Sequence, residues 1–556
     1  MGLGLALCGS LALGVLTGPR TAHADPVVFE LTETMAADWH WTLDDPQIEA
    51  SGGDDANIFD LRNRLNLRLR TGEWTFGLRL DLALFADPPS PQYRNDIRPE
   101  EMFVTWRGEH WTLTAGDDYL TLGRGLALSL RKFDEVGFAT NLRGAHARFR
   151  TTGFETRFGV GFTNVVNVDS VDEKKVPDPA DVVALARLET DALGPVTVGV
   201  NVVDIERRHS NLRNALTGPL YDDTSADPGD PGYRIQGRRQ ARTLIVGGDL
   251  KARLADKVDL QLDGAWLENQ ATRETLSGDV PADSHGLALY GAVTATFGRW
   301  TALLEGKHYD HWKVESSLHP DTADAQGITQ VFPYVAPPSL ERIDQRVVNN
   351  SDVTGVHLRV DHTFDDNARG DRNVLFVSSA FFVDAPAEDE WTLHAYLGWE
   401  RNTKAGERLS IQTGYRREEA PDAAAGGLTR LGMWHLDLDW TRTVAAGVDL
   451  QLHWAHEIRQ KNVGVATLAE SYFEGTFYAT LSLPPTWSFT LQTEYLTAES
   501  EPSPYYFGAF LQWKPSSADL VRLFVGRSKG GLKCSGGVCR IFPDFEGVKL
   551  ETTLRF

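Results

Sequence analysis

The last twelve residues of the chain, "FEGVKLETTLRF" (545–556), alternate between two kinds of side chain, and this feature constrains the fold more than any other. Successive side chains of a β-strand point to opposite faces, so the pattern predicts a strand that runs to residue 556. An open sheet would leave the edge of this strand unpaired, whereas a barrel in which the last strand pairs with the first has no edge. After Gly547, one face carries Val548, Leu550, Thr552, Leu554 and Phe556, and the other carries Lys549, Glu551, Thr553 and Arg555.

The same alternation extends over nearly the whole chain from Phe29. In the segments 29–41, 74–84, 258–266 and 391–399, apolar or aromatic residues occupy nearly every second position. Strands of about 10–14 residues exceed the usual length of about 5–6 in soluble sheets. Short turns such as "RTGEW" and "FGRW" alternate with long polar loops. We therefore predict an all-β fold, a transmembrane antiparallel β-barrel of about 24 strands with short periplasmic turns, long outer loops and both termini in the periplasm.

Composition is compatible with this fold and narrows the partners. Charged residues make up 24% of the chain, and the net charge is −22, which argues against binding nucleic acid. We expect bacterial outer-membrane lipid and lipopolysaccharide to surround the barrel, and the barrel-assembly machinery to insert it. A periplasmic or lipoprotein partner fits the same location, and no cofactor is expected. A soluble sandwich or propeller is the alternative, but the chain has no repeat of blade length.

The first 24 residues differ from the rest, being small and apolar, and they end in "TAHA". This pattern predicts a signal peptide over 1–24, with cleavage after Ala24, and a barrel over 25–556. Cys8 belongs to that segment, which leaves Cys534 and Cys539 in the last long loop, in "GGLKCSGGVCRIF". In an oxidising compartment the short, Gly-rich gap between them predicts a disulfide.

The chain end resembles the C-terminal signature of bacterial outer-membrane proteins, a final Phe preceded by apolar residues at every second position. Phe556, Leu554, Leu550 and Val548 match that signature, and the resemblance implies that they form the assembly signal. Two further segments, "GDDYLTLGRGLALSLRKFDEVG" (116–137) and "GGLKCSGGVCR" (530–540), resemble an uncharacterised family of large bacterial outer-membrane barrels. That family implies a location and a fold but no activity.

The second strand concentrates arginines on one face, because Arg62, Arg64, Arg68 and Arg70 alternate with Leu61, Leu65, Leu67 and Leu69. Each arginine would cost about 2–4 kcal/mol near the midplane of a bilayer, so these side chains must face the lumen. Arg79 and Asp81 join them on the next strand. Two interpretations stay open: an anion-selective path, or ion pairs that anchor a plug. Acidic residues predicted to face inward on later strands give the lumen mixed charge: Asp437, Asp439, Asp449 and Glu457.

A barrel of this size would leak unless something fills its lumen. The candidates within the chain are the two longest loops, 207–240 and 313–351, and the more apolar segment 119–138. The leading functional hypothesis is a channel, or an export or uptake conduit, for a polar solute or polymer. The alternative is a plugged barrel that acts as a surface scaffold or anchors partners.

Enzymatic signatures are weak, and we expect no catalysis. In "HWAHE" (453–457), His453 and Glu457 share one face of a strand and His456 lies on the other, so they cannot hold one metal. The loop 221–232 offers a weak Ca²⁺ candidate whose spacing differs from that of an EF-hand; a solvated acidic loop is the alternative. Its acidic residues are Asp222, Asp223, Asp227 and Asp230.

Overall fold

The computed structural model contains one large sheet that closes on itself. It describes residues 27–556 except for the segments 43–55, 87–94, 134–137, 164–180, 208–212, 215–217, 220–237, 276–277, 282–283, 313, 315–327, 330–333, 337, 339, 341–351, 367–370, 385–389, 423–426, 464–467, 500–503, 536–537 and 543.

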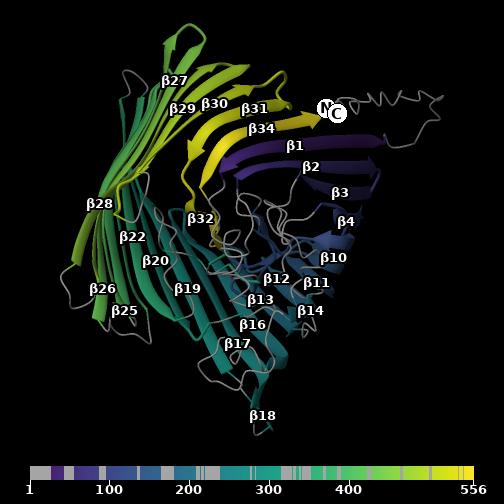
Figure 1. Ribbon diagram of the computed structural model, residues 1–556. Helices are drawn as coiled ribbons and strands as arrows, with labels where there is room; N and C mark the ends of the chain where they lie inside the picture. Colours follow the sequence, from purple (N-terminus) through teal and green to yellow (C-terminus); the bar gives the residue numbers. More distant parts are fainter. Residues whose placement is uncertain are drawn as a thin grey trace.

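Twenty-four antiparallel strands form the wall of the barrel (Figure 1). In chain order they are β1 (Val28–Thr42), β2 (Ala56–Thr71), β3 (Trp74–Phe85), β4 (Asp96–Arg107), β5 (Trp111–Asp118), β10 (Leu142–Thr151), β11 (Phe154–Phe162), β12 (Val182–Thr190), β13 (Val196–Arg207), β16 (Arg238–Ala255), β17 (Val258–Thr275), β19 (Ser284–Phe297), β20 (Trp300–Asp310), β22 (Val353–Asp366), β23 (Asp371–Asp384), β24 (Glu390–Asn402), β25 (Arg408–Asp422), β26 (Gly427–Ala445), β27 (Val448–Val463), β28 (Leu468–Leu483), β29 (Trp487–Leu496), β30 (Tyr505–Trp513), β31 (Leu520–Ser528) and β34 (Phe545–Arg555). The predicted fold class is confirmed.

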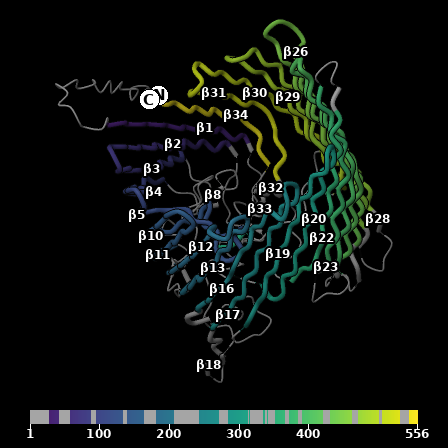
Figure 2. Tube along the Cα trace, turned by 180° about the vertical axis from the view of Figure 1, so that it is seen from behind, coloured from purple at the N-terminus to yellow at the C-terminus, as the bar shows by residue number. Residues whose placement is uncertain are grey.

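The barrel closes where β34 pairs with β1, in a register that runs from Thr32↔Arg555 to Thr42↔Glu546. Phe556 extends this ladder, because its amide donates to the carbonyl of Leu31 at 2.8 Å and its carbonyl accepts from the Leu31 amide at 3.2 Å. The first and last strands of the barrel therefore lie side by side (Figure 2). The well-formed final strand has a partner on both sides, β31 and β1.

Connections alternate in length around the ring, as predicted. At one end, tight turns join the strands, and Gly298 between β19 and β20 adopts a φ of +62°, which glycine tolerates best. The start of β1 lies at this same end, because Val28 pairs with Arg70 beside the turn at 72–73. Between β25 and β26 the pairing continues up to Asp422↔Gly427, so only four residues separate these two strands.

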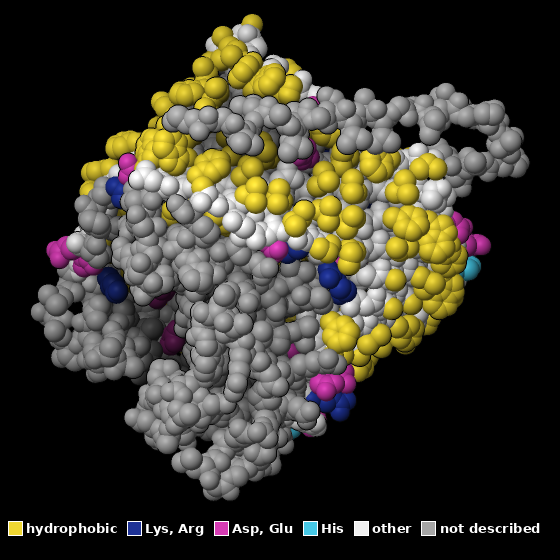
Figure 3. Space-filling view, turned by 45° about the vertical axis from the view of Figure 1, so that its right-hand side comes forward, with side chains coloured by type: hydrophobic (Ala, Val, Ile, Leu, Met, Phe, Trp, Pro, Cys, Tyr) yellow, Lys and Arg dark blue, Asp and Glu magenta, His cyan; other side chains and the backbone are white. Residues whose placement is uncertain are grey.

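The outer face carries an apolar band between two aromatic girdles. Near the short turns, exposed rings include Trp74, Trp111, Trp300, Trp487 and Trp513; towards the other end they include Trp39, Trp41, Phe59, Trp434 and Tyr505. Figure 3 shows hydrophobic side chains covering much of the face that contains β1 to β4. Such a band with two girdles is typical of a barrel in a bilayer. Among the described residues, no helix is long and apolar enough to cross a membrane.

Shorter strands lie outside the ring ladder. Between β5 and β10 the chain forms β6 (Thr121–Leu122), β7 (Leu128–Ser129), β8 (Lys132–Phe133) and β9 (Phe138–Ala139). Further short strands are β14 (Arg213–Asn214), β15 (Gly218–Pro219) and β18 (Gly278–Pro281), the last of which pairs with β17. In the last long loop, β32 (Gly531–Ser535) and β33 (Val538–Phe542) form a hairpin, and β21 (Ile328–Thr329) adds a third strand to it.

The hairpin places Cys534 directly opposite Cys539. Their side chains lie outside the described residues, and the disulfide stays a prediction. The predicted signal peptide and the acidic residues Asp222, Asp223, Asp227 and Asp230 also lie outside the described residues.

Candidate functional site

The segment between β5 and β10 turns inward and packs on the inner face of the wall. We call residues 119–133 the inner segment. Its leucines are almost fully buried, and Leu122 and Leu128 keep only 1% and 0% of their surface exposed. They form one hydrophobic cluster with wall residues of β12, β13, β16, β17 and β19, namely Val183, Leu185, Val203, Ile205, Ile245, Ala265, Leu267 and Ala288. The inner segment is therefore held mainly by burial of apolar surface, at about 1.5–3 kcal/mol for each leucine.

A second loop, between β20 and β22, packs on the inner segment. Its described residues Trp312, Tyr334, Val335 and Leu340 belong to the same hydrophobic cluster. The amide of Ser129 donates to the Tyr334 carbonyl at 2.7 Å, and the amide of Ala336 donates to the Gly125 carbonyl at 2.8 Å. The two loops thus support each other by backbone hydrogen bonds as well as by packing.

Arg131 lies at this junction between the two loops. Its guanidinium donates to the Val335 carbonyl at 2.9 Å, and burial lowers the pKa of Arg131 to about 10. The Arg131 guanidinium is therefore partly removed from water, and its hydrogen bond links the inner segment to the second loop.

The tip of the inner segment is a tight turn that reaches a pair of carboxylates on the wall. Gly123 and Gly125 both adopt positive φ, +57° and +93°. The backbone amide of Arg124 donates to Asp263 at 3.2 Å. A Cβ on Gly123 would lie 3.1 Å from an oxygen of Asp249 and 3.1 Å from an oxygen of Asp263. Glycine is therefore required at 123 by both its backbone conformation and the close approach of the carboxylates.

The carboxylate of Asp249 is held in place from behind by Arg187 of β12. Arg187 donates to both oxygens of Asp249, at 2.6 and 3.1 Å, and to Asn201 at 2.6 Å. This ion pair crosses β13 at Gly199, where a Cβ would lie 2.5 Å from the guanidinium. Because this ion pair is buried and bidentate, it holds the Asp249 carboxylate in one position, and the tip of the inner segment docks there.

A cavity of about 680 Å³ adjoins the tip on the side of the short turns. Arg124 enters it from the inner segment, with its guanidinium 4.9 Å from the centre of the Tyr290 ring and 3.0 Å from Gln261. Lys251, Arg253, Asp259 and Glu305 also line it. The lining combines these charged side chains of both signs with apolar ones such as Leu260 and Leu303, in contrast to the wholly apolar contact above it.

The predicted lumen arginines join acidic partners on the same face of the sheet. Arg62 donates to Asp60 at 2.9 Å and contacts Asp38. Arg64 lies 3.8 Å from Asp81, and Arg70 lies 3.6 Å from Glu30. Arg68 shares their face of β2. Asp437, Asp439, Asp449 and Glu457 share one face of β26 and β27 with His435 and His453.

Arg79 and Asp81 form a bidentate pair at 2.6 Å that reaches the inner segment through Glu101. Glu101 lies 3.6 Å from Arg79 and accepts hydrogen bonds from Tyr119 at 2.9 Å and Lys132 at 2.7 Å. Part of the arginine network therefore contacts the inner segment. Over β12 to β19 the inner face combines the apolar residues that contact the inner segment with the buried charges of Arg187, Asp249 and Asp263.

Three wall residues adopt the spacing of a catalytic triad, although no motif predicted it. The Ser378 hydroxyl lies 2.8 Å from His357 Nε2, and His357 Nδ1 lies 2.7 Å from Glu305. Tyr290 donates to the other Glu305 oxygen at 2.5 Å. A catalytic serine must be reachable by its substrate, but Ser378 has 0% of its surface exposed. In this conformation the residues form a buried hydrogen-bond chain. In the "HWAHE" segment, His453 contacts Asp439 and His456 contacts Tyr495, as expected for opposite faces.

Within the described part of the chain, two clusters bring a histidine and two carboxylates together as candidate metal ligands. Asp38, His40 and Asp60 are buried, with candidate ligand atoms within 4.8 Å of one another. Arg62 contacts both carboxylates and Lys549 lies 3.5 Å from Asp38, so these two cations already balance the two acids and a divalent ion fits poorly.

The second cluster lies at the exposed rim, where His311 bridges Asp310 at 2.6 Å and Asp352 at 3.5 Å. The hydrogen bond that His311 donates to the Asp310 carboxylate raises the pKa of His311 above its usual value. This cluster joins the end of β20 to the residue just before β22. It is a solvent-exposed clamp on the second loop.

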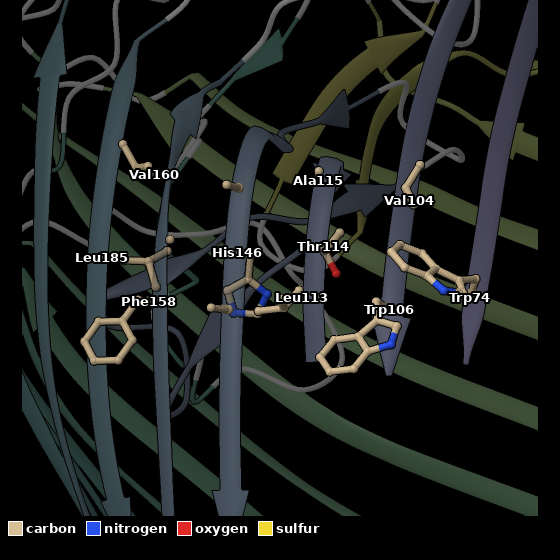
Figure 4. Close-up of a pocket in the computed structure, with 13 residues that line it drawn as sticks. Trp74, Val104, Trp106, Leu113, Thr114, Ala115, His146, Phe158, Val160 and Leu185 are labelled. Carbon is tan, nitrogen blue, oxygen red and sulfur yellow. The ribbon is translucent and has the colours of Figure 1, made fainter. Parts of the chain in front are cut away.

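A separate groove of about 520 Å³ opens on the outer face over β3, β4, β5, β10 and β11 (Figure 4). Trp74, Trp106, Leu113 and Phe158 surround it, and small residues such as Ala115 and Ala147 form its floor. The groove lies in the apolar band and away from the polar cavity beside the tip.

Comparison with known proteins gives a family resemblance without an activity. Residues 5–159 and 455–556 match a family of unknown function, DUF6029. These two stretches make up less than half of the chain, and they include both segments that resemble an uncharacterised barrel family. No curated protein matches the chain.

Among solved structures, the siderophore receptor PirA from Pseudomonas aeruginosa is similar at 9% identity, covering 96% of this chain and 81% of its own, with a TM-score of 0.46. The copper transporter OprC is similar at 11% identity, covering 97% and 82%, with a TM-score of 0.44. The translocation pore of the P pilus usher PapC is similar at 7% identity, covering 96% and 99%, with a TM-score of 0.35. Scores this low carry no argument, and the barrel assignment depends on the strand pairing itself.

Proposed function

We propose that this protein is a bacterial outer-membrane conduit for a polar solute or polymer, closed at rest by the inner segment and the second loop. The observation that carries the proposal is the hydrophobic cluster between Leu122, Leu128 and the wall residues Ile205 and Ile245. A loop that only lined an open pore would be surrounded by water and would not need an apolar surface on the wall to pack against. The polar cavity beside Arg124 supplies the hydrated part of the path.

In the closed state, the leucines and the tip of the inner segment contact the wall together, so all these contacts are lost when the segment moves away. Burial of leucines is non-directional, whereas the tip contacts at Asp249 and Asp263 fix the register of docking. Opening then requires the inner segment to leave the wall. In this proposal the tight turns and both termini face the periplasm, the clamp at His311 faces outward, and the assembly machinery reads Phe556.

An engineered disulfide tests the gate. A Cβ built on Gly247 of β16 lies 3.5 Å from the Cβ of Ala127, which falls within the range of natural disulfides. In a background with Cys534 and Cys539 changed to serine, we would join Ala127→Cys to Gly247→Cys. Planar-bilayer conductance would be recorded in moderate urea, which weakens apolar burial.

We expect the reduced double variant to conduct in urea and the oxidised form to stay closed, with the two single variants insensitive to oxidant. A barrel lacking residues 121–130 should conduct without urea. If neither the shortened barrel nor the reduced variant conducts, the conduit proposal fails and the scaffold alternative is favoured. If the oxidised form conducts as well as the reduced form, the inner segment is not the gate.

A further inference from the structure

The outer face at the barrel seam carries a polar strip inside the apolar band. Glu33 on β1 and Asn63 on β2 are joined by a hydrogen bond of 2.7 Å from the Asn63 amide to the Glu33 carboxylate. Thr552 on β34 and Asn63 lie on either side of Met35, because both pair with it. We call Glu33, Asn63 and Thr552 the seam strip.

Register places the seam strip on the outward face. Glu33 and Met35 alternate with Thr34 and Ala36 and share the face of Trp39, which is exposed in the girdle. The inward face of the same strands carries the buried charges Asp38 and Asp60. The neighbours of Glu33 across the two ladders are apolar, Leu65 on β2 and Leu554 on β34.

The depth of the strip makes it unusual. Along β1, Glu33 lies between the exposed girdle residues Phe29 and Trp39. With a rise of about 3.4 Å per residue and a tilt of about 40°, it lies about 10 Å above Phe29 in a band about 25 Å tall. Ionisable residues in a bilayer are costly and usually meet a polar partner. If the seam strip faced only lipid, its remaining donors and acceptors would have no hydrogen-bond partner, and each such group would cost free energy.

The unused capacity is balanced between donors and acceptors. Among the described contacts, the strip makes only the Glu33–Asn63 bond, which leaves one N–H and the oxygen of Asn63, the second oxygen of Glu33 and the hydroxyl of Thr552. A surface with both kinds of group in one small area is self-complementary. In a two-fold dimer each patch contacts its own copy, which is the arrangement that such a surface fits.

We propose that the seam strip is the centre of an interface with a second copy of this chain, related by a two-fold axis along the membrane normal. That axis brings the two strips to the same depth, where each Asn63 can donate to the partner's Glu33 and accept from the partner's Thr552. By analogy with hydrogen bonds between membrane helices, each bond across the interface would contribute about 0.6–2 kcal/mol. The proposal depends on the proposed membrane location, but not on whether the barrel conducts.

Cross-linking provides the first test. Glu33→Cys in the Cys534→Ser, Cys539→Ser background should form a disulfide-linked dimer of the full-length protein in lipid nanodiscs under mild oxidation. Leu491→Cys, exposed on the outer face of β29, is the matched control and should stay monomeric. A dimer at both positions or at neither overturns the proposal.

Mass analysis of uncrosslinked protein provides the second test. We expect light scattering in mild detergent to give a dimer for the natural sequence, and at least tenfold weaker association for Glu33→Leu with Asn63→Leu. Thr493→Leu, which removes an outward polar group on β29, should leave association unchanged. Heat-modifiable migration on gels shows that each variant has formed its barrel.

The conservative variant Glu33→Gln should still dimerise, because the amide oxygen has two lone pairs and can accept from its own Asn63 and from the partner's Asn63. A natural protein that is monomeric in these assays, or a Glu33→Cys variant that cross-links to a different protein in native membranes, rules out the second copy. Failure of the conductance test would leave all these results unaffected, and a barrel that does not fractionate with membranes would remove both proposals together.

Discussion

Changing Gly123 to Ala tests whether the tip of the inner segment holds it on the wall. Gly123 has a φ of +57°, and an added methyl would lie 3.1 Å from oxygens of both Asp249 and Asp263. An alanine in the left-handed region costs about 1–2 kcal/mol, before any cost of moving the carboxylates. Each 1.4 kcal/mol is a factor of ten, so the undocked population should rise about 5- to 30-fold.

The assay is the rate at which a maleimide labels Ala127→Cys, a buried position on the inner segment, in the background without Cys534 and Cys539. If opening is rapid and reversible, the labelling rate follows the open population even when that population is very small. Gly298→Ala is the matched control, because Gly298 has a φ of +62° and no atom within 4 Å of its Cβ position. It introduces the same backbone strain at a turn far from the segment.

Equal labelling rates in the two variants would refute this reasoning, since they would show that the tip does not contribute to docking. A large increase in Gly298→Ala alone would show that labelling reports global unfolding. The expected result is an increase confined to Gly123→Ala.

Four further outcomes are expected. Leu128→Ala should raise the same labelling rate by at least tenfold, because emptying a fully buried leucine site costs about 2–5 kcal/mol; a rate within twofold of the parent would contradict the apolar docking. The pKa of His311 is raised, so its ion pairs with Asp310 and Asp352 are fully formed below the ordinary histidine pKa of about 6.5 and are lost as the pH rises through the raised value. The rate at which Ala127→Cys is labelled in the His311→Gln variant, divided by the rate with His311 present, should therefore exceed one at acidic pH and approach one at alkaline pH. Changing Arg62, Arg64, Arg68 and Arg70 to Gln removes four positive charges from the face that carries Asp38, Asp60 and Asp81, so the reversal potential of a barrel lacking residues 121–130 should shift towards cations; no shift would place these arginines away from the path. Cys534 and Cys539 should resist alkylation until reductant is added, and two freely alkylating thiols in protein taken from membranes would disprove the disulfide.

Alternation in the sequence was sufficient to predict the barrel because a strand with lipid on one side and lumen on the other must alternate. The strands of the C-terminal half, such as β24 with Trp391, Leu393 and Leu397 on one face, follow this rule closely. The inner segment was one of three candidate fillers, because its leucines are out of place in an outer loop. Its partner surface could also have been found: "VVALARL" in β12 and "VTVGVNVVDI" in β13 are apolar on both faces, as expected where both faces are covered.

Other parts of the site could not be read from the sequence because they depend on register between distant strands. Ser378, His357 and Glu305 come from three strands, and a shift of one residue in either ladder would turn a side chain to the other face. The seam strip has the same origin, since Glu33 and Thr552 are neighbours only because the last strand pairs with the first.

The strength of the apolar contact also limits how the proposed gate can work. Five buried leucines, Leu120, Leu122, Leu126, Leu128 and Leu130, contribute at most about 8–15 kcal/mol to docking, measured from full exposure. Taken alone, before the entropy regained on undocking, 8 kcal/mol corresponds to an undocked population of about one in a million, which is too small to sustain a steady flux. A ligand or partner that opens the conduit must therefore bind the undocked state more tightly by a comparable free energy, or give the leucines another apolar surface. A small polar solute offers too few contacts for this, whereas a polymer or a protein offers enough. The closed state thus favours a macromolecular trigger, and small ions alone should leave the natural protein silent in a bilayer.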